Sequence, residues 1–173
     1  MVVIEKLRKV KRIVDRSVYV LTGRRPWSRG YNASKFAFIK KQLRNNDICE
    51  KFLSSSTLPQ GYGYAYDERV VEYPWTLTRL NEGHGKLLDA GSVFNFAEIV
   101  EHPKVSSKDL TIFTLAPEYQ AFWYKGISYQ YGDLRSLPFR DEWFDEICSL
   151  STLGHIGMDN RIYTNKSEGE KIG

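Results

Sequence analysis

The chain has 173 residues, of which 42% are hydrophobic and 27% are charged, so it can bury a core and lacks the composition of a disordered protein. Its net charge of +4 conceals an asymmetry. Residues 1–51 carry 14 Lys and Arg against 4 Asp and Glu, whereas residues 52–173 carry 11 against 17. A basic N-terminal part therefore precedes an acidic part.

Cysteine content and hydropathy exclude several classes of protein. Cys49 and Cys148 are the only cysteines and form no disulfide framework, which favours a reducing, cytoplasmic location. No apolar run reaches membrane-spanning length, and the N-terminus alternates charge too often for a signal peptide. The histidines and cysteines lack the spacing of metal ligands, so we predict no metal site.

The first segment has the pattern of a basic amphipathic helix that ends at Gly23. Its apolar residues recur at three- and four-residue steps: Val3, Leu7, Val10, Val14, Val18 and Leu21. Such a helix can lie on a membrane, bind nucleic acid, dock on a partner or pack within the chain. Because its apolar face has no Trp or Phe, the sequence favours packing over membrane binding.

Two further helices are expected before a linker. Asn32 or Ser34 would cap the first, which runs to about Arg44, and Asp47 would cap the second. The polar stretch 54–61 is the clearest linker in the chain. We therefore predict a basic helical extension over residues 1–58 and a second domain over residues 59–173. Within that domain, Pro74 should divide the helical stretch 68–80 into two kinked pieces.

The rest of the chain is organised around KLLDAGSVFN at 86–95. Lys86 to Leu88 reads as a buried strand, Asp89 ends it, and the small residues at 90–92 can form a tight turn. A helix over 94–100 would then offer its free N–H groups to an anionic or polar ligand. Strand, acidic residue, small-residue turn and helix are how a doubly wound α/β domain opens its ligand crevice.

Three more strands follow, over 109–115, 127–131 and 146–150. We expect a helix between the first two, starting at Ala116-Pro117-Glu118 and ending at Gly126, and a final helix starting near Asp159. The sequence thus predicts an α/β fold with a mostly parallel sheet. Residues 151–155 would lie just past the fourth strand, where ligand sites of open α/β sheets are found.

Three stretches together resemble the class I, Rossmann-like S-adenosylmethionine-dependent methyltransferases: LLDAGSVFN at 87–95, GDLRSLPFRDEWFDEI at 132–147 and CSLSTLGHIG at 148–157. The resemblance covers roughly residues 68–159 and implies that residues 59–173 form a partial, methyltransferase-like cofactor-binding domain. It implies a doubly wound, mostly parallel sheet that is incomplete at the C-terminus, because such domains have about three more strands. An exposed sheet edge would favour homo-oligomerisation.

The resemblance also implies roles for individual residues toward S-adenosyl-L-methionine. Asp89 would pair with the amino group of its methionine part, and Gly91 would let the backbone pass close by. Asp133 would accept a hydrogen bond from the adenine amino group, while the Leu134 N–H would reach a ring nitrogen. The cofactor-binding set implied is Asp89, Gly91, Glu118, Asp133, Leu134, Ser149 and Ser151, with Ser149 to Thr152 near the sulfonium and His155 as candidate base.

The chain departs from the family pattern in several places, including Leu153-Gly154-His155, where the family often has Leu-Glu-His. Val93 and Asn95 occupy the later positions of its glycine-rich turn, and Thr114 stands where an acidic residue usually holds the ribose, which leaves Glu118 as the nearest carboxylate. These departures favour a second interpretation, a non-catalytic methyltransferase-like binding module. A nicotinamide-dependent oxidoreductase is disfavoured because Gly91 does not begin a G-x-G-x-x-G motif.

The sequence does not identify the methyl acceptor. The turn LDAGS followed by Asn resembles enzymes of surface-polysaccharide and glycan pathways, so a small molecule or sugar is the first expectation. The basic arm keeps RNA as an alternative acceptor, which would bind less tightly as salt rises.

Overall fold

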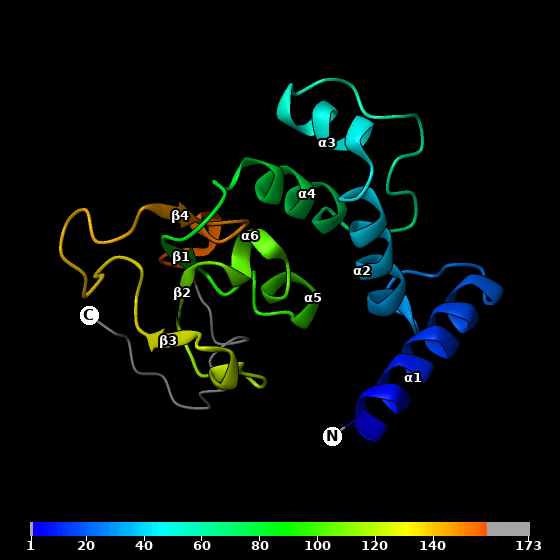
Figure 1. Cartoon of the computed structure of the whole chain (residues 1–173), viewed down its shortest axis with the longest axis horizontal. Helices are drawn as coiled ribbons and strands as arrows, with labels where there is room; N and C mark the ends of the chain where they lie inside the picture. Colours follow the sequence, from blue (N-terminus) through cyan, green and yellow to red (C-terminus); the bar gives the residue numbers. More distant parts are fainter. Residues whose placement is uncertain (1, 159–173) are drawn as a thin grey trace. The chain divides into compact units, whose positions relative to one another are not determined.

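The computed structural model describes residues 2–158 and, within its first helix, the side chains from Val10 onward. It divides into two compact units, Met1–Arg79 and Leu80–Gly173, which are described separately here (Figure 1). By compactness, residues 59–79 group with the N-terminal helices. This division reflects compactness alone, so the start of a cofactor-binding domain after residue 58 stays a prediction.

The first unit contains four helices: α1 (Val2–Leu21), α2 (Tyr31–Gln42), α3 (Asn46–Leu53) and α4 (Arg69–Arg79). The predicted caps are wrong. Gly30, in the left-handed conformation, precedes α2, and a Cβ there would lie 1.8 Å from the carbonyl oxygen of Asp15. Only glycine therefore lets α2 begin against α1. The Asn45 side chain, rather than Asp47, caps α3 by accepting from the N–H groups of Asp47 and Ile48.

Helix α4 runs through Pro74 without the predicted break. A proline inside a helix leaves the carbonyl four residues earlier without its partner. Here that carbonyl belongs to Val70, and it accepts a hydrogen bond from the Tyr62 hydroxyl at 3.0 Å. The side chain replaces the missing N–H, so one helix forms in place of two.

Aromatic and charged side chains fix the segment before α4 onto the first two helices. The Tyr19 hydroxyl donates to the carbonyl of Ala65, and the Tyr31 hydroxyl accepts from the N–H of Asp67. Lys35 and Asp67 form a buried ion pair at 2.7 Å. Burial is also the main reason that the pKa of Tyr31 rises to about 12. Tyrosines of the first unit thus form much of its core.

The second unit is built on a four-stranded, all-parallel sheet in the order β3-β2-β1-β4. Its strands are β1 (Lys86–Ala90), β2 (Asp109–Thr114), β3 (Ser128–Tyr131) and β4 (Glu146–Cys148). Helices α5 (Ala97–Val100) and α6 (Pro103–Ser106) connect β1 to β2. The prediction of an α/β fold with a parallel sheet is confirmed.

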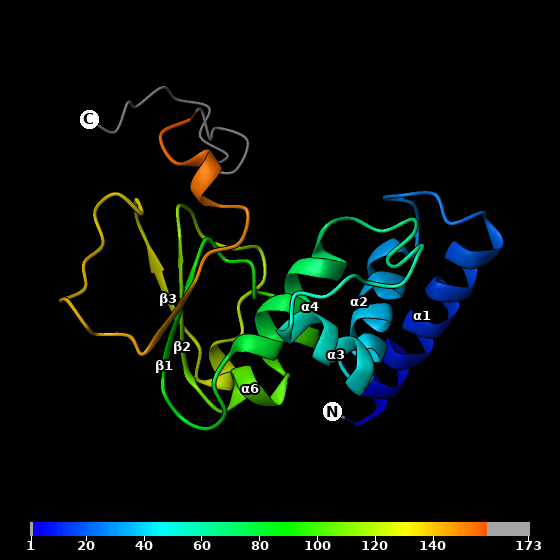
Figure 2. The same ribbon diagram turned by 90° about the horizontal axis from the view of Figure 1, so that it is seen from above.

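The two faces of the sheet are covered differently. Figure 2 shows α6 beside one face and the long connection from β3 to β4 on the other. On the second face, Leu88, Ala90 and Phe113 form a buried cluster. The side chains packed against this cluster all come from the β3–β4 connection: Leu134, Phe139 and Phe144.

Two predicted helices differ from the structure. The helix expected over 94–100 begins only at Ala97, and the N–H groups of Val93 and Phe94 before it donate to Asp89. The helix expected over 116–126 is reduced to one 3₁₀ turn, η1 (Trp123–Lys125). Strand β4 ends at Cys148, earlier than predicted. The helix expected near Asp159 lies outside the described residues.

Candidate functional site

The order of the strands identifies where a ligand crevice can form. β1 lies between β2 and β4, and the chain leaves β1 toward β2 but later returns to its other side. In open α/β sheets, ligands bind outside the carboxyl ends of the strands at such a switch point. The candidate site is therefore the turn that follows β1 together with the segment that follows β4.

Asp89 is fully buried and organises the turn after β1. One carboxylate oxygen accepts the N–H of Val93 at 3.2 Å, and the other accepts the N–H of Phe94 at 2.7 Å. Hydrogen bonds of this kind, between a charged acceptor and backbone donors, are among the strong ones in proteins. The N–H groups that the sequence assigned to a ligand are thus already bound to Asp89.

The turn itself brings backbone and hydroxyl groups to the carboxyl end of β1. Gly91 has φ +123°, and a Cβ there would lie 2.0 Å from Thr152 Oγ1. Close approach of the segment after β4 therefore requires glycine at this position. Ser92 also has a positive φ of 62°, and its Oγ is buried without a hydrogen-bond partner among the described residues. Thr152 belongs to the segment predicted to line the cofactor near its sulfonium, whereas Ser92 was not predicted as a site residue.

The predicted residues after β4 fall into two groups. Ser149 Oγ donates to the carbonyl of Ala90 at 3.1 Å, which ties the ends of β4 and β1 together. Ser151 and His155 are exposed, and His155 belongs to the short 3₁₀ turn η2 (Leu153–His155). Asp89, Gly91 and Ser149 are thus brought to one end of the sheet, while the assignment of His155 as a base stays a prediction.

Asn95, which replaces a glycine of the family pattern, has a structural role. Its Oδ1 accepts from the Tyr129 hydroxyl at 2.7 Å, and its Nδ2 donates to the carbonyl of Gln120 at 2.8 Å. The same Tyr129 hydroxyl accepts the N–H of Phe122. A side chain at position 95 therefore joins the turn after β1 to the connection between β2 and β3, which glycine could not do.

Asp133 and Leu134 follow β3, two strands away from β1. Asp133 is paired with Arg135 at 2.6 Å, and its carboxylate also accepts the Arg135 N–H. Hydrogen bonds from the Arg135 side chain, followed by the one from its backbone, lower the pKa of Asp133 to about 2. Leu134 packs on the cluster formed with Phe113, so its side chain serves the core and only its backbone is available for the predicted contact.

The predicted ribose region lies beyond the end of β2. Thr114 is the last residue of that strand, and Glu118 follows in an irregular segment. Glu118 is half-buried and close enough to Tyr129 to raise the pKa of that hydroxyl, although burial is the larger cause. The structure therefore keeps Glu118 at the carboxyl end of the sheet without assigning it a ligand.

Part of the stretch that carries the family resemblance serves the fold. Phe139 and Phe144 cover the sheet. Asp145 accepts the Lys86 N–H at 2.7 Å, and Glu146 pairs with buried Lys108 at 2.6 Å. These last contacts lie at the amino end of the sheet, opposite the candidate site. In this stretch, only the start (132–134) lies where a ligand of the crevice could be reached.

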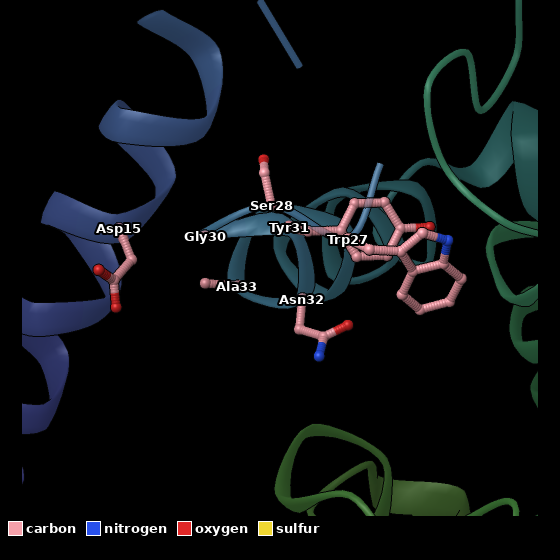
Figure 3. Close-up of a pocket in the computed structure, with 7 residues that line it drawn as sticks. All are labelled: Asp15, Trp27, Ser28, Gly30, Tyr31, Asn32 and Ala33. Carbon is pink, nitrogen blue, oxygen red and sulfur yellow. The ribbon is translucent and has the colours of Figure 1, made fainter. Parts of the chain in front are cut away.

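A separate surface hollow of about 220 Å³ lies in the first unit, where α1 meets the start of α2 (Figure 3). It is lined by Asp15, Trp27, Ser28, Gly30, Tyr31, Asn32 and Ala33. Its carboxylate, that of Asp15, is already paired with Arg29 at 2.8 Å. The hollow thus offers no free charged group, and we do not assign it a ligand.

Comparison with known proteins adds no assignment. Within residues 2–158, no cluster of three His, Cys, Asp or Glu side chains is suited to a metal ion, and no helix has the length and apolar content of a membrane span. The chain matches no protein-family model, and no curated protein or solved structure is significantly similar to it. What can be said of function therefore depends on the site itself.

Proposed function

We propose that this chain is an S-adenosylmethionine-dependent methyltransferase with a Rossmann-like sheet, acting on a small-molecule or glycan acceptor in the cytoplasm. The observation that carries the proposal is the turn at the end of β1, placed at the switch point of a parallel sheet ordered β3-β2-β1-β4. The motifs at 87–95, 132–147 and 148–157 support it by their order and spacing.

The residues present fit the cofactor in part. When bound, the cofactor would supply a methyl group already activated on a sulfonium. Asp133 has an ionised carboxylate that can accept from an adenine amino group, and Ser92 Oγ is a buried hydroxyl without a partner in the described chain. Asp89 fits its expected role less well, because both of its oxygens hold the turn; we assign it the shaping of that turn.

The work of this chain in methyl transfer would be to position donor and acceptor. The turn at 91–92 and the segment at 149–152 would exclude water from the reacting atoms. If the acceptor is a hydroxyl, His155 would take its proton. His155 lies in η2 just past β4 and is exposed, so an acceptor could reach it from solvent.

One observation favours the second candidate, a non-catalytic methyltransferase-like binding module. The Thr152 side chain lies directly against Gly91, in the space through which a cofactor would approach the backbone. For a binding module this contact would persist. For an enzyme, the segment after β4 would have to move when the cofactor binds.

Calorimetric titration with S-adenosylmethionine and S-adenosylhomocysteine tests the proposal. We expect saturable binding that Asp133→Ala weakens and that Asp141→Ala, which alters an exposed carboxylate of the same connection, leaves unchanged. Arg135→Gln serves as a second control because it removes the ion pair but keeps the carboxylate. No binding to a chain shown by circular dichroism to be folded would contradict the proposal and favour the binding module.

A screen of acceptors would follow. Transfer of labelled methyl groups to glycans supports the primary expectation. Transfer to RNA, falling steeply as salt is raised, would instead assign the basic arm of residues 1–51 to RNA recognition.

A further inference from the structure

Over Val10 to Leu21, where its side chains are described, helix α1 packs in the first unit by one side. Tyr19 is fully buried, the carbonyl of Asp15 lies against Gly30, and the Asp15 carboxylate pairs with Arg29. Since helical residues advance by about 100° each, Asp15 and Tyr19 define the side of α1 that faces α2. The apolar face that was predicted to pack, which includes Val10 and Val14, lies on a different side of this helix.

The opposite side carries an uncovered apolar stripe. Its apolar side chains are between 46% and 85% exposed: Val10, Ile13, Val14, Val20 and Leu21. At helical spacing they fall within about a third of the circumference. The prediction that the apolar face packs within the chain is therefore wrong for Val10, Val14 and Leu21. Five exposed apolar residues on one helix side indicate a binding surface rather than scattered surface residues.

Positive charge borders this apolar stripe on both sides. Lys11 flanks one edge and Arg16 the other, and both side chains are exposed. The acidic residue of the same stretch, Asp15, faces α2 and is neutralised by Arg29. A helix with an apolar stripe between basic residues is suited to lie in the plane of a bilayer surface that carries negative charge.

We infer that α1 binds the surface of an anionic lipid bilayer, with the apolar stripe turned toward the acyl chains and Lys11 and Arg16 among the headgroups. The charges argue against other occupants. Two copies joined through the stripe would bring Lys11 and Arg16 of one copy near those of the other. RNA would engage these basic residues but leave the apolar side chains in water. An anionic bilayer satisfies both parts of the surface.

Vesicle co-sedimentation of the full chain tests this inference. We expect binding to vesicles that contain phosphatidylglycerol and little binding to pure phosphatidylcholine. The triple variant Val10→Gln/Ile13→Gln/Val14→Gln should weaken binding by about tenfold or more, because it removes much of the buried apolar surface. A matched control is Leu53→Gln/Val71→Gln, which changes exposed apolar residues of α3 and α4 and should bind like the wild type.

Two further variants test the electrostatic part of the inference. Lys11→Gln and Arg16→Gln should each lower the affinity about fivefold, and raised salt should do the same. Circular dichroism would verify that each variant is folded. Vesicle binding that the triple variant leaves unchanged would overturn the inference, as would binding of RNA but not vesicles. A dimer in light scattering that the triple variant dissociates would also overturn it, because a second copy would then cover the stripe.

Discussion

The two ends of the parallel sheet are built for different purposes. At the amino end, charged and polar groups are paired: Lys108 with Glu146, and Asp145 with the N–H of Lys86. At the carboxyl end, Gly91 and Ser92 adopt positive φ angles, and Ser92 Oγ is buried without a partner in the described chain. Both ends belong to the same four strands.

This difference separates residues that stabilise from residues that can act. Strained backbone and unpaired buried groups cluster at functional sites, whereas the paired groups at the amino end contribute to stability. Substitutions at the amino end should therefore change the free energy of unfolding without altering cofactor binding. Those at the carboxyl end should affect both.

The largest effect is expected from Lys108→Met at the amino end. The Lys108 side chain is 1% exposed and its partner Glu146 is 14% exposed, so the substitution leaves a nearly buried carboxylate without its cation. We expect a loss of about 3 kcal/mol in the free energy of unfolding, measured by urea denaturation. The double variant Lys108→Met/Glu146→Gln should recover much of it. A loss below about 1 kcal/mol would mean that the pair is effectively solvated.

Gly91→Ala should have the next largest effect and should act at the carboxyl end. The added Cβ would clash with Thr152, and the alanine would have to adopt φ +123°. Together these effects should lower the free energy of unfolding by about 2 kcal/mol. Gly83→Ala is the control, because Gly83 also has a positive φ but nothing within 4 Å of the added atom. Adding Thr152→Ala should reduce the cost at Gly91 and not at Gly83. Equal costs in both backgrounds would show that Thr152 does not occupy this space.

How far the sequence predicts this molecule depends on the kind of interaction. Strands β1 and β2 were predictable because mostly buried apolar runs bounded by turns follow local patterns. Two of the failures involve a side chain that bonds to a backbone group outside its own element. Tyr62 completes helix α4 at Val70, and Tyr129 accepts the N–H of Phe122 where a helix was expected. No local pattern reveals such a partner.

The candidate site was predictable in position but not in detail. Asp89 and Gly91 were found because an acidic residue and small residues follow a buried strand. That Asp89 would use both oxygens on the turn, or that Thr152 would lie against Gly91, depends on how segments far apart in the chain approach each other. The hydrogen bonds of Asn95 to Tyr129 and Gln120 could not be predicted either, because both partners lie far away in the sequence.

A smaller effect should come from pH through His102. Its Nδ1 accepts the N–H of Lys104 at the start of α6. Burial, and then the nearby Lys104, lower the pKa of His102 below its usual 6.5. The unfolded chain therefore binds the proton more readily, so stability is full above about pH 6.5 and falls as the pH drops below it. His102→Asn, which can cap without titrating, should flatten this dependence in thermal melts between pH 5 and pH 8.

The smallest effect concerns Asp133, at the carboxyl end. Arg135 holds the pKa of this exposed carboxylate at about 2, below its value of about 3.9 in an unfolded chain. Any stability from the pair is thus present above about pH 4 and lost as the pH falls toward 2. Carboxyl NMR titration should show Arg135→Gln raising the pKa toward the ordinary value, with almost no change in unfolding, because exposed pairs contribute little. Asp133 stays ionised near neutral pH in both proteins, so the proposed adenine contact predicts that Arg135→Gln preserves cofactor affinity while Asp133→Ala lowers it. Equal losses in both would mean that the pair, and not the carboxylate, shapes the site.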